Sequence, residues 1–177
     1  MKSKALGRLT RISLAAALMC VIAPLALPIG PIPLTLGTFC LFLIPLCFRP
    51  SDSFLTVLVY IAVGALGLPV FSGFTGGAQA FVGPTCGFLF AFPFASFLIS
   101  FIGGGLGGRL ARRLCALLLG TVFLYVCGGI GYLWVMNVPF DRSLLFLFLP
   151  LLLGELLKMA VSLFVFARLA PFLQKKG

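Results

Sequence analysis

The sequence consists of long apolar runs separated by short segments in which charged residues, prolines and glycines gather. Six apolar segments are recognisable, at residues 12–29, 34–48, 54–66, 88–102, 114–136 and about 150–170. No segment alternates polar and apolar residues as the lipid-facing strand of a β-barrel does. Within a bilayer, a chain satisfies its backbone polar groups either in helices or in closed barrels. The pattern therefore predicts an all-α integral membrane protein, with one domain over residues 1–177 and six transmembrane helices.

The composition agrees with a membrane protein. Hydrophobic residues make up 62% of the chain and charged residues only 9%, whereas about a quarter of a soluble globular domain is charged. The net charge of +10 does not indicate a nucleic-acid partner. The positive residues stand at the ends of the apolar segments, where membrane topology places them.

The distribution of the positive residues predicts the orientation. With six segments and both termini on one side, eleven of the thirteen Lys and Arg residues fall on that side, namely Lys2, Lys4, Arg8, Arg11, Arg49, Arg109, Arg112, Arg113, Arg168, Lys175 and Lys176. The positive-inside rule assigns this side to the cytoplasm. We therefore expect a multi-pass protein of the bacterial cytoplasmic (inner) membrane, with both termini in the cytoplasm.

A long Gly-rich stretch, residues 67–87, separates the third and fourth segments. Its two prolines and six glycines prevent one regular helix. The stretch is nevertheless apolar, and Phe71, Phe74 and Phe81 argue against a flexible linker. Non-helical backbone at membrane depth is tolerated where protein or a cavity covers it. We expect a structured external loop that folds back over a pocket.

Two charged residues, Glu155 and Lys158, stand inside the last apolar segment. Their i, i+3 spacing places them on one face of a helix. A charge near the bilayer centre costs at least ~2.5–3.5 kcal/mol on insertion scales, so such residues usually pair and face the protein interior. Two interpretations remain open. One is a structural ion pair that joins two helices, and the other is a binding site for a ligand with a carboxylate and hydrogen-bonding groups.

Pro150 is expected to mark the start of the sixth helix, because proline is favoured in a first helical turn. A start there leaves about 20 residues, the length of a spanning helix. Residues 143–149 would then form a short interfacial helix or lid, and Glu155 and Lys158 would lie at a shallow depth below the Gly-rich stretch.

Several classes of chemistry are disfavoured by missing residue types. The chain contains no histidine, which removes histidine-dependent metal sites and Ser-His or Cys-His catalysis. The six cysteines form no Cys-x-x-Cys pair, and the chain has no Walker-type ATP loop. A single carboxylate inside the membrane leaves no acid–base pair for an intramembrane enzyme. We expect no enzymatic activity, no cofactor and no metal.

The first segment carries a stripe of small side chains at three- and four-residue steps, formed by Ser13, Ala16, Ala17 and Cys20. Small residues let transmembrane helices approach closely. The stripe is a candidate face for a partner helix, although small residues are also common in membrane helices generally.

Two sequence stretches resemble the signature of the BioY family, the biotin-specific S components of energy-coupling factor (ECF) transporters. They are GLPVFSGFTGG at residues 67–77 and GPTCGFLFAF at residues 83–92. The GELLK at residues 154–158 resembles the family's Gly-Asp-x-x-Lys, with Glu155 in place of Asp. The stripe in the first segment resembles the Ala-x-x-x-Ala element through which S components contact the transmembrane coupling subunit.

The resemblance implies a biotin-binding membrane subunit that mediates biotin uptake, with an ECF coupling subunit and ATPases as partners. Biotin would be bound by polar groups of Glu155, Lys158, Gln79 and Thr85 and covered by the rings of Phe71 and Phe74. Which end of biotin faces Lys158 stays open. Alternatives are an S component for a different vitamin, or a structural membrane protein without a ligand.

Overall fold

The computed structural model describes residues 2–27, 32–104, 107–137 and 143–174. Over these ranges the chain forms six α-helices: α1 Lys2–Ile22, α2 Gly37–Cys47, α3 Pro50–Ala65, α4 Cys86–Gly103, α5 Leu110–Met136 and α6 Ser143–Gln174. Two 3₁₀ helices, η1 Ser72–Phe74 and η2 Ala78–Phe81, lie between α3 and α4. Two short antiparallel strands, β1 Ala26–Leu27 and β2 Leu34–Thr35, lie between α1 and α2. The predicted helical class is confirmed.

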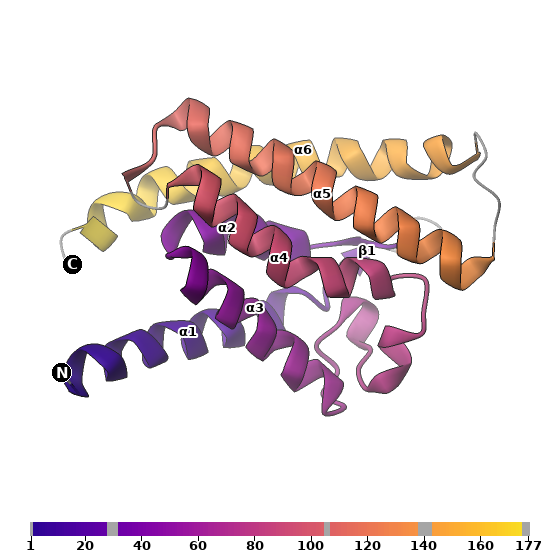
Figure 1. Cartoon of the computed structure of the whole chain (residues 1–177), viewed down its shortest axis with the longest axis horizontal. Helices are drawn as coiled ribbons and strands as arrows, with labels where there is room; N and C mark the ends of the chain where they lie inside the picture. The colour runs from indigo at the N-terminus through magenta and orange to yellow at the C-terminus, as the bar shows by residue number, and fades with distance from the viewer. Residues whose placement is uncertain (1, 28–31, 105–106, 138–142, 175–177) are drawn as a thin grey trace.

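The helices pack side by side in one bundle (Figure 1). Helix α4 packs mainly against α5 and α3, α6 packs against α2, and α1 packs against α3. The start of α1 and the end of α6 lie at the same end of the bundle, on the left of Figure 1. The Gly-rich stretch, residues 67–87, is called the Gly-rich segment from here on. This segment and β1 lie toward the opposite end.

Three helices in the described part of the chain are long and apolar enough to cross a membrane. They are α4, α5 and the Ala5–Ile22 part of α1, and α2 and α3 are shorter apolar helices. Helix α6 has 32 residues and is interrupted by the charges of Glu155, Lys158 and Arg168. The chain is thus a multi-pass membrane protein.

The sixth helix differs from the prediction. It is continuous from Ser143 to Gln174, so the expected start at Pro150 and the separate segment 143–149 are wrong. A proline inside a helix removes one backbone hydrogen bond, and transmembrane helices tolerate this loss. At 1.5 Å per residue, Glu155 and Lys158 lie about 18 and 22 Å from the helix start. The two charges therefore lie near the middle of α6.

The first helix also differs in its bounds, because it begins at Lys2 and ends at Ile22, whereas the apolar run suggested 12–29. The charged N-terminal residues continue the helix. Beyond Ile22 the chain turns at Pro24 into the β1–β2 hairpin, in which Ala26 pairs with Thr35. A hairpin of two-residue strands has too short an alternation to be recognised from the sequence.

Buried apolar side chains form two main clusters in the bundle. The first surrounds the Gly-rich segment and includes Met19, Leu41, Tyr60, Phe71, Phe92 and Leu124. The second, here called the terminal-end cluster, consists of Phe42, Leu46, Ile99, Ala116, Leu117, Met159 and Phe166. Its members come from the later parts of α2, α4 and α6 and from the early part of α5. It therefore fills the half of the bundle nearer the termini.

Helices α4 and α5 approach each other closely through glycines. A Cβ atom built on Gly131 would lie 2.6 Å from Gly87 Cα, and one built on Gly87 would lie 2.9 Å from Gly131 Cα. Real Cβ contacts are not this short, so both positions require glycine. This contact fixes α5, and with it Tyr125 and Tyr132, against the rest of the bundle.

Candidate ligand-binding site

Glu155, Lys158 and Thr38 form a closed triangle of hydrogen bonds in the interior of the helical bundle. Lys158 Nζ donates to Glu155 Oε1 at 2.9 Å and to Thr38 Oγ1 at 2.8 Å. Thr38 Oγ1 donates to Glu155 Oε1 at 2.9 Å. Glu155 is 4% exposed and Lys158 7%. Charge-assisted bonds of this kind are strong in a dry site, so the triangle ties the start of α2 to the middle of α6.

A cavity of about 750 Å³, part of it open to solvent, lies beside this triangle. The wall is mainly apolar and aromatic with interspersed hydroxyl groups, and it is formed by Ala23, Ile32, Pro33, Thr35, Gly37, Thr38, Tyr60, Phe71, Ser72, Thr75, Ala80, Thr85, Phe88, Leu89, Phe92, Leu124, Tyr125, Leu151 and Glu155. Glu155 is the one ionic side chain among these described lining residues.

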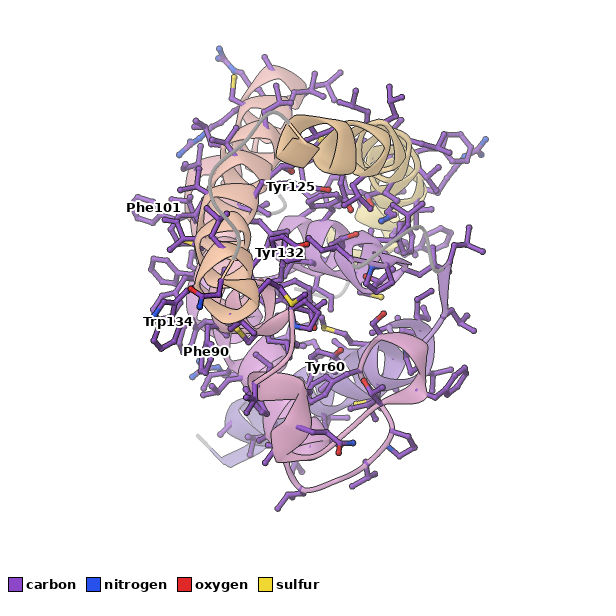
Figure 2. All side chains as sticks on the ribbon, turned by 90° about the vertical axis from the view of Figure 1, so that its right-hand side faces the viewer. Tyr60, Phe90, Phe101, Tyr125, Tyr132 and Trp134 are labelled. Carbon is purple, nitrogen blue, oxygen red and sulfur yellow. The ribbon has the colours of Figure 1, made fainter. Side chains whose placement is uncertain are left out.

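The aromatic side chains divide clearly between the interior and the outer face. Figure 2 shows Tyr60, Tyr125 and Tyr132 directed into the bundle, and Phe90, Phe101 and Trp134 at its periphery. Tyr60 and Tyr125 line the cavity. The peripheral aromatic residues are exposed, as lipid-facing side chains are.

Phe71 anchors the Gly-rich segment over the cavity. Its side chain is 2% exposed and makes edge-on ring contacts with Tyr60 at 5.6 Å and with Phe81 at 5.8 Å between ring centroids. The Tyr60 hydroxyl donates to the Val70 carbonyl at 3.1 Å. Phe71 therefore forms part of the cavity wall from within the segment.

The backbone of the Gly-rich segment forms hydrogen bonds with residues near the C-terminal ends of α1 and α3. Gly77 N–H donates to the Gly64 carbonyl of α3 at 2.7 Å, and Gly73 N–H donates to the Pro24 carbonyl after α1 at 3.0 Å. Gly73 and Gly77 have φ of 69° and 83°, which favours glycine at both positions. The segment is thus held in a defined conformation between α1, α3 and the cavity.

A second cavity, of about 760 Å³, lies on the other side of β2 and is lined by Lys158, Phe74, Gly73 and apolar residues of the hairpin region. The two residues of β2 face different cavities. Thr35 lines the first cavity and Leu34 lines the second, because successive residues of a strand point to opposite faces. The hairpin therefore separates the two cavities.

Gly154 allows this arrangement. A Cβ atom on Gly154 would lie 2.6 Å from Leu34 Cδ1, so a larger residue here would require the Leu34 side chain to move away from α6. The glycine that precedes Glu155 is thus explained by packing against the hairpin.

The structure brings together some of the predicted ligand-binding residues and separates others. Glu155, Thr85 and Phe71 line the first cavity. Lys158 lines the second cavity and is connected to the first through its hydrogen bond to Glu155. Phe74 is 63% exposed and lines only the second cavity. Gln79 is exposed and lines neither of the two cavities described here. The ring of Phe74 and the amide of Gln79 therefore do not contribute to the first cavity.

Thr38, Ser72, Tyr60 and Tyr125 were not identified from the sequence. Thr38 could have been found as the hydroxyl in the first turn of the second apolar segment, where a partner for Lys158 was needed. Ser72 stands inside the Gly-rich stretch, where nothing in the sequence shows which side chains point inward. The two tyrosines lie on different helices, and their convergence depends on how those helices pack.

The small-residue stripe of α1 divides between two environments. Ser13 and Ala17 are exposed, whereas Ala16 is 3% exposed and Cys20 packs partly against the first core cluster. Helix α1 is fixed to α3 by an ion pair of 2.6 Å between Arg8 Nη2 and Asp52 Oδ1. The exposed face of α1 therefore contains Ser13 and Ala17, while Ala16 belongs to the protein's own core.

The fold and the site define a helical membrane protein with a mostly apolar cavity beside a buried ion pair. A sequence model of the BioY family matches residues 1–175. The chain belongs to the BioY family.

Relatives and a solved structure agree with this family. A Pyrococcus horikoshii protein named "Probable biotin transporter BioY" is 36% identical over 159 residues, which are 89% of this chain and 93% of that protein. "Biotin transporter BioY2" of Lactococcus lactis is 34% identical over 158 residues, which are 89% of this chain and 87% of that protein. A crystal structure of the S-component for biotin from an ECF-type ABC transporter superposes with a TM-score of 0.87 at 25% identity, over 100% of this chain and 95% of that chain.

Proposed function

We propose that this protein is a biotin-binding S component that mediates biotin uptake together with an ECF coupling subunit and ATPases. The observation that carries the proposal is the Glu155–Lys158–Thr38 triangle beside an aromatic cavity, in a chain whose whole length superposes on a biotin S component. A structural ion pair alone would not require a cavity lined by aromatic and hydroxyl side chains beside it.

The site suits the chemistry of biotin. Biotin combines an apolar thiolane ring and valeryl chain with a ureido group and a carboxylate. Glu155 Oε2 is buried and has no hydrogen-bond partner among the described residues, so it is available to accept a ureido N–H. Lys158 can attract a carboxylate or donate to a carbonyl. Phe71 and the other aromatic side chains of the wall would cover the ring, and Thr85 offers a neutral hydroxyl group.

We further propose that all six helices cross the membrane as a single domain. In this topology both termini are cytoplasmic and the Gly-rich segment is external. The common location of the α1 start and the α6 end supports this (Figure 1). So does the positive-inside rule, because a six-helix topology puts eleven of the thirteen positive residues of the sequence on the side of the termini.

ATP-driven uptake would draw its energy from a partner, because the sequence lacks a Walker-type ATP loop. We propose that a helix of the coupling subunit docks on the exposed face of α1 around Ser13 and Ala17. Their small side chains would allow close approach of that helix. The Arg8–Asp52 ion pair supports this role because it holds α1 in place on α3.

Tritiated biotin binding to the detergent-purified protein tests the ligand. We expect saturable, stoichiometric binding that unlabelled biotin abolishes and that thiamin and riboflavin do not affect. Competition by another vitamin would instead indicate an S component for that vitamin, and absence of binding would contradict the proposal. Uptake by cells with and without a co-expressed ECF module tests the coupling.

A further inference from the structure

Two residues that line the first cavity each carry a buried side-chain oxygen without a hydrogen-bond partner in the part of the chain that the structure describes. The two oxygens are Glu155 Oε2, from α6, and Ser72 Oγ, from the Gly-rich segment. A buried polar atom without a partner costs free energy. Two such atoms on separate elements of one cavity indicate that the molecule that fills the cavity supplies their partners.

The residues before and after Ser72 in the chain hold its backbone in place. Phe71 before it is held by its ring contacts, and Gly73 after it donates its N–H to the Pro24 carbonyl at 3.0 Å. The Thr75 hydroxyl donates to the Ser72 carbonyl at 3.0 Å. The backbone of Ser72 is thus restrained by its neighbours, whereas the side-chain hydroxyl remains free to turn about one bond.

We propose that Ser72 is a ligand-contacting residue and supplies the polar contact of the Gly-rich segment, a role for which the exposed Gln79 is unsuitable. This inference rests on the proposed function. Glu155 Oε2 can only accept a hydrogen bond, whereas a serine hydroxyl both donates and accepts. The pair therefore fits a neutral group that carries N–H donors next to a carbonyl acceptor, which is the chemistry of a cyclic urea.

The charges around the first cavity agree with a neutral group. Glu155 is the ionic side chain among the described lining residues, and Lys158 lines the second cavity. A ligand carboxylate placed in the first cavity would face a like charge. Ser72 would consequently contact the ureido ring and not the carboxylate.

The test compares Ser72→Ala and Ser72→Cys with Gln79→Ala, a control from the same segment whose side chain lines neither cavity. Biotin affinity and ligand-free thermal unfolding are measured on the detergent-purified proteins. We expect Ser72→Ala to weaken biotin binding about three- to tenfold, the effect of one hydrogen bond. The biotin affinity of Ser72→Cys should lie between those of wild type and Ser72→Ala. The affinity of Gln79→Ala should stay within about twofold of wild type.

The ligand-free unfolding temperature distinguishes a ligand contact from a structural role. Because Ser72 Oγ has no described partner to lose, Ser72→Ala should unfold at or above the wild-type temperature without biotin. A lower ligand-free unfolding temperature would mean that the hydroxyl stabilises the protein itself, and would overturn the inference.

A biotin affinity of Ser72→Ala within twofold of wild type would also overturn the inference about Ser72. Desthiobiotin, which keeps the ureido group and lacks the sulfur, should show the same loss, and a loss confined to biotin would contradict the ureido assignment. If wild-type protein binds no biotin, the proposed function itself fails.

Discussion

The ring of Phe71 lies directly against the backbone of Gly64 in α3. A Cβ atom built on Gly64 would stand 2.1 Å from Phe71 Cζ, a distance that non-bonded carbons do not reach. The absence of a side chain at Gly64 therefore creates the space into which the Gly-rich segment inserts its anchoring ring. The wall of the first cavity depends on this contact.

Gly64→Ala should displace Phe71 and disturb the cavity wall. Overpacking of this kind costs about 1–3 kcal/mol, so we expect a lower unfolding temperature and weaker biotin binding in the detergent-purified variant. Gly7→Ala is a suitable control, because a Cβ there would meet nothing within 4 Å. Equal stability and binding of Gly64→Ala and wild type would contradict the role assigned to the Phe71 contact.

Lys158→Ala should abolish high-affinity biotin binding while the protein remains in the membrane. The substitution leaves the Glu155 carboxylate buried without its cation, which typically costs about 3–5 kcal/mol of stability. Loss of one member of a buried charge pair also weakens binding by at least about 30-fold. Filter binding of tritiated biotin and membrane abundance give the two readouts. Binding within twofold of wild type would favour a purely structural ion pair.

The double variant Glu155→Gln with Lys158→Met separates stability from binding. Replacing both members of a buried ion pair by uncharged residues of similar size is often neutral or stabilising. We therefore expect near-normal thermal unfolding together with loss of biotin binding. A double variant that still binds biotin normally would exclude both charges from ligand recognition.

Substitutions on α1 should distinguish docking from packing. Ser13→Trp with Ala17→Trp enlarges the exposed face, and we expect normal biotin binding but loss of energised uptake in cells that supply the ECF module. Ala16→Trp is the matched comparison, because Ala16 is buried and the bulky ring should lower stability and binding. Normal uptake by the exposed-face variant would show that no partner helix docks there.

Reporter fusions test the proposed topology. An alkaline phosphatase fused after Gly177 should be inactive and a green fluorescent protein fused there should fluoresce, because both termini are expected in the cytoplasm. An insertion beside the exposed residue Leu68 of the Gly-rich segment should instead be accessible from outside. Phosphatase activity at the C-terminus would contradict the six-helix topology.

The sequence predicted the parts of the fold that depend on composition and local spacing. The apolar segments indicated a helical membrane protein. The i, i+3 spacing predicted that Glu155 and Lys158 share one face of a helix, where the structure contains their ion pair. The Gly-rich stretch was expected to adopt defined structure around its phenylalanines, and Phe71 is indeed buried.

The remaining parts depend on contacts between distant segments. Thr38 meets Lys158 across 120 residues, and no local pattern reveals that pairing. Pro150 suggested a helix start because the favoured position of proline is a strong local signal, yet the helix continues through it. The stripe on α1 could not be divided into an exposed and a buried face until its neighbours were known, because Ala16 and Ala17 are equally small.

The terminal-end cluster has a consequence for the membrane in which the protein resides. Phe42, Leu46 and Phe166 are almost completely buried in the half of the bundle beyond the ion pair, and the guanidinium of Arg113 lies 4.2 Å from the centre of the Phe166 ring. Close-packed side chains of this kind leave no room for a file of water molecules. We therefore expect the bundle to be electrically insulating, so that a cell can hold many copies of this protein without dissipating its proton gradient through them.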